Sequence, residues 1–184
     1  PQPVSGCEYL IENNMRAAAC GYIFRKEVLR ELKFTPGIYH EDEEFTPQLL
    51  LRSTRVFDTN AQAYYYRQRS GSITHNIDRK VIDKRLKDIL RVIDHLKAIA
   101  IQSSTQSKAA LERRVAQLTM DYLYHIIVLT KSRRQLDATI EELKKQGLYP
   151  LPDRQYTRKY ILFRKLIDSH WGRQILMSGL KVKR

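Results

Sequence analysis

The stretch RKVIDKRLKDILRVIDHLKAIA, residues 79–100, repeats apolar side chains at alternating intervals of four and three. These positions are Ile82, Leu86, Ile89, Ile93, Leu96 and Ala100. Side chains that recur in this way share one face of an α-helix. A second run has the same spacing: Leu111, Val115, Leu118, Tyr122, His125 and Leu129. We therefore expect two long helices, at 78–102 and 109–130, which pack antiparallel across a turn at 103–107.

The residues after 130 continue the helical pattern. A shorter helix is expected at 136–146 and should end at Gly147, since glycine is common just after a helix C-terminus. Pro150 and Pro152 then interrupt the chain, and a basic amphipathic segment begins near Tyr156. Residues 77–184 are thus predicted to form a basic C-terminal helical domain.

The first 76 residues mix helical and strand-like patterns. Helical spacing predicts helices at 6–13, 25–32 and 41–53, whereas strand-like stretches fall at 15–24, 55–58 and 62–67. A turn is expected at 34–38, which contains Pro36 and Gly37. The sequence therefore predicts an α+β protein, with an α/β unit at 1–76 followed by an antiparallel helical bundle.

Length and composition are those of a globular protein. The chain has 184 residues, 42% of them hydrophobic, enough to bury a core. No apolar run approaches the roughly 20 residues of a spanning helix, and the N-terminus lacks a signal-peptide pattern. The chain begins with proline, which suggests a piece of a longer polypeptide. Cys7 and Cys20 are too few for a disulfide framework, which favours a cytoplasmic location.

The net charge of +13 is unevenly distributed. Residues 1–60 hold seven Lys and Arg against nine Asp and Glu, which gives −2, so residues 61–184 hold the remaining +15. A basic half of this kind favours an anionic partner, such as the phosphates of a nucleotide or lipid, an acidic membrane surface or nucleic acid.

The string YHEDEEF, residues 39–45, carries the most chemical information. Acidic residues at a helix start have an ordinary explanation, because carboxylates there satisfy unpaired amides and the positive end of the helix dipole. The neighbouring segments suggest a second role. A small-residue segment, a helix with basic residues at its start and a Phe-x-x-Gly turn precede the string, and YYYRQRSGSI at 64–73 follows it.

This order resembles the second half of the catalytic domain in family-two glycosyltransferases of the GT-A fold. There, an F-x-x-G segment precedes a Glu-Asp pair at a helix start, and a Y-x-Y-R-x-R-x-x-S segment follows. The matching residues are Phe34, Gly37, Glu41, Asp42, Phe45, Tyr64, Tyr66, Arg67, Arg69 and Ser72. The likeness covers residues 5–76 and implies a partial GT-A-like acceptor-side segment of an inverting enzyme in surface polysaccharide or glycoconjugate biosynthesis.

The resemblance implies that Asp42 is the general base that takes the proton of an acceptor hydroxyl, with Glu41 shaping the site or pairing with an arginine. His40 is a rival base, because the ordinary pKa of histidine lies near neutrality. A surface role for His40 is the alternative. Glu43 and Glu44 are expected to be solvated carboxylates of the first turn.

The resemblance also places Arg67, Arg69 and Ser72 at the diphosphate of a nucleotide sugar, or at a phosphate on the acceptor. Guanidinium groups suit that role because they bind phosphate oxygens in a bidentate manner. The alternative is an edge strand whose basic residues prevent aggregation.

The family binds its nucleotide sugar through an N-terminal half, in which an Asp-x-Asp motif holds a divalent metal. This chain contains no Asp-x-Asp motif. The resemblance therefore implies that Mg²⁺ or Mn²⁺ is bound by the full-length enzyme and not by this fragment, which alone should be inactive.

The tail at 154–184 contains nine Lys and Arg, one acid (Asp168) and apolar residues that include Phe163 and Trp171. This mixture is typical of a helix that lies on an anionic membrane. A lipid-linked acceptor at the inner face of the membrane would suit such a tail. A helix packed on the bundle, with a solvated basic face, is the alternative.

Two other functions compete with the glycosyltransferase. One is a basic helical module that binds nucleic acid, although the chain has no recognition-helix, zinc or RNA-binding motif. The other is a scaffold in which the long helices form a homodimer, which an exposed apolar seam on those helices would favour.

Overall fold

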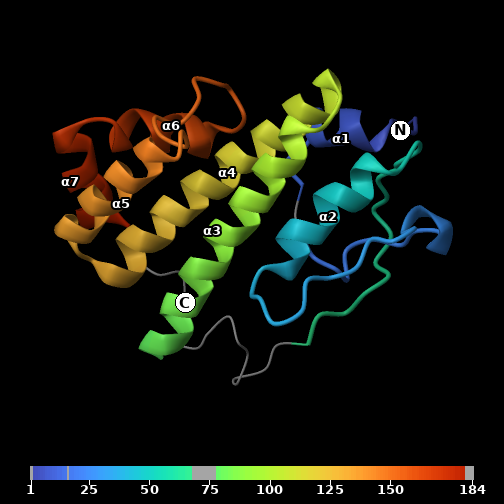
Figure 1. The fold of residues 1–184 in the computed structure, drawn as a ribbon, viewed down its shortest axis with the longest axis horizontal. Coiled ribbons are helices and arrows are strands. Elements are labelled where there is room, and N and C mark those ends of the chain that lie inside the picture. The colour runs from blue at the N-terminus through green and yellow to red at the C-terminus, as the bar shows by residue number, and fades with distance from the viewer. Residues whose placement is uncertain (1, 16, 68–77, 181–184) are drawn as a thin grey trace. The chain divides into compact units, whose positions relative to one another are not determined.

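The computed structural model describes residues 2–15, 17–67 and 78–180 (Figure 1). These residues form seven α-helices and one short 3₁₀ helix. The chain divides into two compact units, Pro1–Arg114 and Val115–Arg184. The division falls inside helix α4 (Thr105–Thr130). The domain boundary predicted after residue 76 lies outside the described residues and stays a prediction.

The first unit contains α1 (Gly6–Glu12), the 3₁₀ helix η1 (Lys26–Val28), α2 (Glu41–Leu51), α3 (Arg79–Ile101) and the start of α4. Helices α1 and α2 lie in close contact, because a Cβ atom on Gly6 would come within 1.8 Å of the Leu50 carbonyl oxygen. The Gly6 amide donates to the Ser53 carbonyl at 2.8 Å, just beyond α2. A small core joins α1, the segment after it and α4. Its buried members are Leu10, Met15, Ala17 and Ala110.

The second unit contains the rest of α4, α5 (Arg133–Lys145), α6 (Arg158–Ile167) and α7 (His170–Gly179). Ser132, Thr157 and Ser169 cap the last three helices, since each side-chain oxygen accepts an amide of the first turn. Helix α5 is followed by Gly147 with φ of 67°, and the Leu148 amide donates to the Leu143 carbonyl at 2.9 Å. The glycine stop predicted from the sequence is therefore confirmed.

The helical periodicity identified the buried faces of the two long helices well. In α3, Leu86, Ile89, Ile93, Leu96 and Ala100 are buried and Ile82 is half-buried. In α4, Leu111, Val115, Leu118 and Tyr122 are buried, whereas His125 and Leu129 are half-buried. Helix α3 lies in the first unit and most of α4 in the second. The antiparallel packing predicted for these two helices stays a prediction.

The predicted α+β fold, with a partial GT-A-like α/β segment, is wrong. The described residues contain no sheet, and their only strand-like pairing is one antiparallel bridge between Val4 and Val56. The described residues of the stretches 15–24, 55–58 and 62–67 form no strand. A strand needs hydrogen bonds along its length from a neighbour, and among the described residues of these segments only Val56 has such a pairing, with Val4.

Two helix predictions also need correction. The segment 25–32 forms only the three-residue η1 followed by turns, because its apolar residues are at most half-buried and a short helix gains little without packing. The basic tail forms two helices instead of one, with a break at Asp168 and Ser169. Ser169 caps α7 and thereby fixes the break.

Candidate active site

The acid cluster, defined as Glu41, Asp42, Glu43 and Glu44, forms the first turn of α2 as predicted. His40 precedes it in the left-handed region with φ of 64°, and its carbonyl accepts the Glu43 amide at 3.0 Å. Amides at a helix start lack partners within the helix, and the dipole there is positive, so both effects favour carboxylates. The three predicted catalytic residues, His40 to Asp42, thus lie at one helix terminus.

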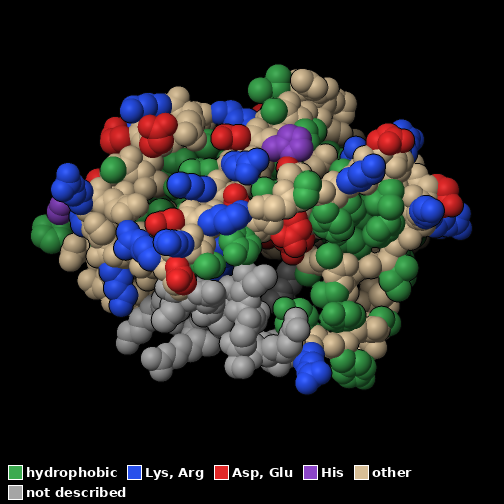
Figure 2. All heavy atoms as spheres, turned by 60° about the horizontal axis from the view of Figure 1, so that its bottom comes forward, with side chains coloured by type: hydrophobic (Ala, Val, Ile, Leu, Met, Phe, Trp, Pro, Cys, Tyr) green, Lys and Arg blue, Asp and Glu red, His purple; other side chains and the backbone are tan. Residues whose placement is uncertain are grey.

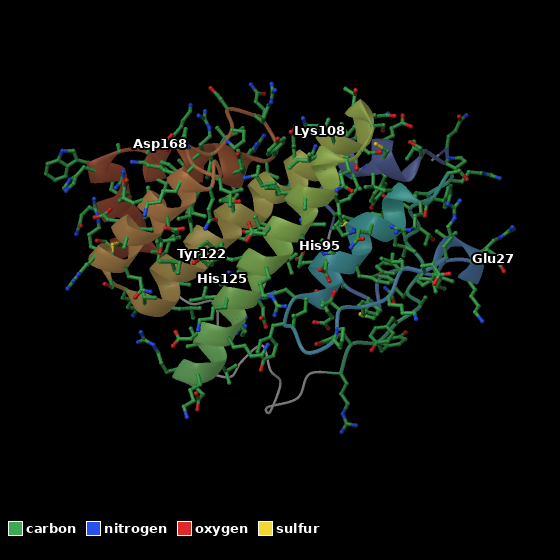
Figure 3. All side chains as sticks on the ribbon, viewed as in Figure 1. Glu27, His95, Lys108, Tyr122, His125 and Asp168 are labelled. Carbon is green, nitrogen blue, oxygen red and sulfur yellow. The ribbon has the colours of Figure 1, made fainter. Side chains whose placement is uncertain are left out.

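Two members of the cluster contact basic side chains, one of which is buried and one about half exposed. Glu43 pairs with Arg114, whose side chain is buried and also donates to the Met15 carbonyl at 3.4 Å. Glu44 is 5% exposed, pairs with His95 and accepts a hydrogen bond from the Thr35 hydroxyl. Figure 3 shows the position of His95 on α3. The expectation that both carboxylates are solvated is wrong for Glu44 and incomplete for Glu43. Their partners lie far along the sequence, where no local pattern indicates them.

Asp42 has a different environment from these two neighbours. It is half-buried, and its Oδ1 accepts the Glu43 amide at 2.9 Å. Burial raises the pKa of the Asp42 carboxyl, and the negative charge of Glu41 raises it further, whereas the hydrogen bond and Arg114 act in the opposite direction with less effect. No ion pair joins Asp42 or exposed Glu41 to another described residue. The cluster therefore contains one partly desolvated carboxyl that no ion pair neutralises.

Tyr22 is a member of the site that the sequence pattern did not reveal. Its hydroxyl lies 3.1 Å from the Thr46 hydroxyl of α2. The pKa of the Tyr22 phenol is raised, first by burial and then by the charges of Asp42 and Cys20, while the hydrogen bond to Thr46 lowers it. The sequence predicts a strand for its segment, and a tyrosine in that pattern gives no signal of proximity to Asp42.

A second buried carboxylate fixes the loop before the acid cluster. Asp88 of α3 is buried and accepts the Tyr39 amide at 2.9 Å. Lys84 pairs with Asp88, donates to the Gly37 carbonyl at 2.7 Å and lies 4.8 Å from the centre of the Tyr39 ring. Burial alone would raise the pKa of Asp88, but the hydrogen bonds from Lys84 and Tyr39 outweigh it and the pKa is lowered. The left-handed turn at His40 is thus attached to α3.

The predicted phosphate-binding residues are not brought to the cluster by any described contact. Arg67 is exposed at the end of an extended stretch, in which the rings of Tyr64 and Tyr66 lie 6.5 Å apart. Arg67 has no hydrogen bond or ion pair with another described residue. Arg69 and Ser72 lie outside the described residues. The role of all three in binding phosphate stays a prediction.

The described ranges bring no three His, Cys, Asp or Glu side chains together as metal ligands. The divalent metal that the resemblance implies for the full-length enzyme stays a prediction. No family model, curated protein or solved structure matches the chain.

Proposed function

We propose that this chain supplies the acceptor side of an inverting glycosyltransferase, with Asp42 as the general base. The observation that carries the proposal is the difference within the acid cluster. Glu43 and Glu44 are held by Arg114 and His95, whereas Asp42 is half-buried, unpaired with any described cation and raised in pKa. A purely structural acidic helix start gives no reason for one carboxyl to be kept in this condition.

The proposed step is a displacement at the anomeric carbon of a nucleotide sugar. The acceptor hydroxyl oxygen forms a bond to that carbon while the bond to the nucleoside diphosphate breaks, which inverts the configuration. The hydroxyl proton passes to the carboxylate of Asp42, whose Oδ1 already accepts the Glu43 amide. A raised pKa makes a carboxylate a stronger proton acceptor, which is what a general base requires.

The proposal assigns donor binding to a part of the enzyme outside these 184 residues. The first unit offers a surface for such a part, because it exposes several large apolar side chains (Figure 2). They are Ile23, Phe24, Phe34, Phe57, Tyr64, Tyr65 and Tyr66. Exposed apolar groups in such number are typical of an interface. Arg67 and Arg69 would then meet the diphosphate of the bound donor.

We also propose a cytoplasmic location and a hydroxyl acceptor, for which a lipid-linked sugar is one option. Both cysteines are free, with Cys20 exposed, which suits a reducing compartment. The dimer alternative receives little support, because the predicted seam positions of α3 and α4 are buried or half-buried. No described feature favours nucleic-acid recognition over sugar transfer.

The test is Asp42→Asn in a polypeptide that joins this chain to a nucleotide-sugar-binding part. We expect kcat to fall by about 10²- to 10⁴-fold, as for a lost general base, with nucleotide binding nearly unchanged. Glu41→Gln is the matched control, since it removes the same charge from the same turn at an exposed position. Its effect on kcat should be much smaller.

Turnover that survives both substitutions would remove the acid pair from the mechanism and make His40 the next candidate. Loss of nucleotide binding together with turnover in Asp42→Asn would also contradict the assignment, because a base for the acceptor has no part in holding the donor.

A further inference from the structure

Helix α6 presents two chemically different faces. Tyr160, Phe163 and Ile167 are spaced as one helical face and are buried. The opposite face contains exposed residues at helical spacing: Arg158, Lys159, Leu162 and Lys165. Exposed Leu162 thus lies on a face with three cations, and α6 contains no acidic residue.

Helix α7 presents an exposed face that is more apolar. Gly172 and Leu176 are buried, and a Cβ atom on Gly172 would come within 2.0 Å of the Leu166 carbonyl oxygen, so α6 and α7 are in close contact. Trp171 is 78% exposed, and Ile175, one turn further along, is 60% exposed. These side chains stay in solvent although the two helices are already packed together.

The cations of the second unit divide into those that make ion pairs within the unit and those that do not. Lys159 of α6 pairs with Asp121 at 3.8 Å. Arg164 pairs with Asp153, and Arg173 pairs with Asp137, so these two arginines serve the unit itself. In contrast, Arg154, Arg158 and Lys165 are exposed, and their side chains have no hydrogen bond or ion pair with another described residue. The second unit therefore combines exposed, unpaired positive charge with exposed Trp, Leu and Ile side chains.

We propose that the exposed faces of α6 and α7 bind an anionic lipid membrane. Trp171 and Ile175 enter the headgroup boundary, while Arg158 and Lys165 contact lipid phosphates. Among the described residues, no helix has the length and apolar character needed to cross a bilayer. The positive charge of the exposed α6 face and the negative charge of the lipid headgroups support a membrane as the partner.

The apolar component favours a membrane over nucleic acid. A surface that follows a phosphate backbone needs cations and hydrogen-bond donors, and it gains nothing from exposed Leu162 and Ile175. An interfacial helix uses both kinds of group. This inference does not depend on the catalytic role proposed for Asp42.

The experiment uses the intrinsic fluorescence of the chain, because Trp171 is its single tryptophan. The chain is titrated with phosphatidylcholine vesicles containing increasing amounts of phosphatidylglycerol, and in parallel with duplex DNA. We expect a blue shift and co-sedimentation that grow with the anionic lipid content. Duplex DNA should produce no blue shift.

Variants are compared by co-sedimentation with the same vesicles. Arg158→Gln with Lys165→Gln should lower the partition coefficient by roughly thirtyfold, because each cation near an anionic surface raises that coefficient by roughly fivefold. Trp171→Ala with Ile175→Ala should lower it by at least about tenfold. The matched controls are Lys87→Gln with Arg134→Gln for charge, and Phe57→Ala with Ile101→Ala for exposed apolar area.

Three outcomes would overturn the proposal. One is the absence of both blue shift and sedimentation with phosphatidylglycerol vesicles. The second is equal loss of binding in a control pair and in the matching test pair. The third is tighter binding to duplex DNA than to vesicles, which would assign the basic surface to nucleic acid.

Discussion

The two units differ in how far their large apolar side chains are buried. In the second unit, side chains such as Leu123, Ile140 and Tyr160 are almost fully buried. Among its described large hydrophobic residues, only Leu162, Trp171 and Ile175 are prominently exposed. In the first unit, exposed aromatic and aliphatic side chains occur throughout 23–66, and Ile23 is 92% exposed. A helix satisfies its own backbone hydrogen bonds and needs only one covered face. A segment outside a helix depends on neighbouring segments both for its backbone hydrogen bonds and for the burial of its side chains. Its side chains therefore stay exposed where neighbours are absent.

The acidic residues show the same contrast on a smaller scale. Asp137 in the second unit receives hydrogen bonds from both Arg133 and Arg173, at 2.8 Å each. Burial alone would raise the pKa of Asp137, but the two arginines outweigh burial and lower it. Asp42 in the first unit has no such partners among the described residues, and its pKa is raised. One carboxylate stabilises its unit, whereas the other is held at some cost to the fold, as functional groups often are.

The largest expected effect tests the contrast in burial. Leu123→Ala should lower the free energy of unfolding by about 2 to 5 kcal/mol, because it removes a fully buried side chain and leaves a cavity. Ile23→Ala, at an exposed position of the first unit, should change it by no more than about 0.5 kcal/mol. Urea unfolding followed by circular dichroism provides the measurement. Equal losses in the two variants would show that the first unit buries Ile23 in solution.

A smaller effect concerns the ion pair beneath the acid cluster. Arg114→Gln should destabilise the chain by about 2 kcal/mol, because Glu43 would keep its charge without its buried partner. Arg91→Gln removes a largely exposed arginine 3.8 Å from Asp88 and should cost under about 0.5 kcal/mol. Thermal unfolding of both variants measures the difference. If Arg114→Gln behaved like Arg91→Gln, the pair with Glu43 would not form.

The smallest effect concerns pH and compares Asp42 with Asp137. The pKa of Asp42 is higher in the folded state than in the unfolded state, where it is about 3.9. As pH rises above that value, the folded state resists ionisation of Asp42 and its stability falls. Wild type should therefore lose stability relative to Asp42→Asn over this rise. The lowered pKa of Asp137 has the opposite sign, so its contribution is full above that pH and is lost as pH falls through its folded value.

Each pH-dependent change should be under about 1 kcal/mol, since both groups retain solvent access. The measurement is urea unfolding of wild type, Asp42→Asn and Asp137→Asn between about pH 3 and about pH 7, which includes the carboxyl pKa. For each variant it gives the slope against pH of the difference in unfolding free energy from wild type. Slopes of the same sign would contradict the contrast between the two carboxylates.

The sequence by itself determined the two long helices and one part of the candidate site. The four-three spacing located α3 and α4 and most of their buried residues, because helical hydrogen bonds are local and the pattern reports only which face is covered. The same locality placed the acid cluster at the start of α2, where the backbone itself favours carboxylates. Glycine at 147 ended α5 for an equally local reason, its tolerance of positive φ.

Only the tertiary structure decided which carboxylates acquire a basic side-chain partner and which segments hydrogen-bond to another segment. Glu43 and Glu44 lie next to Asp42 in sequence, yet Arg114 and His95, distant along the chain, separate their roles. The same dependence on distant partners explains why 15–24, 55–58 and 62–67 read as strands but form none. A strand and an ion pair are both completed by residues elsewhere in the chain, and a local pattern contains no information about whether those residues arrive.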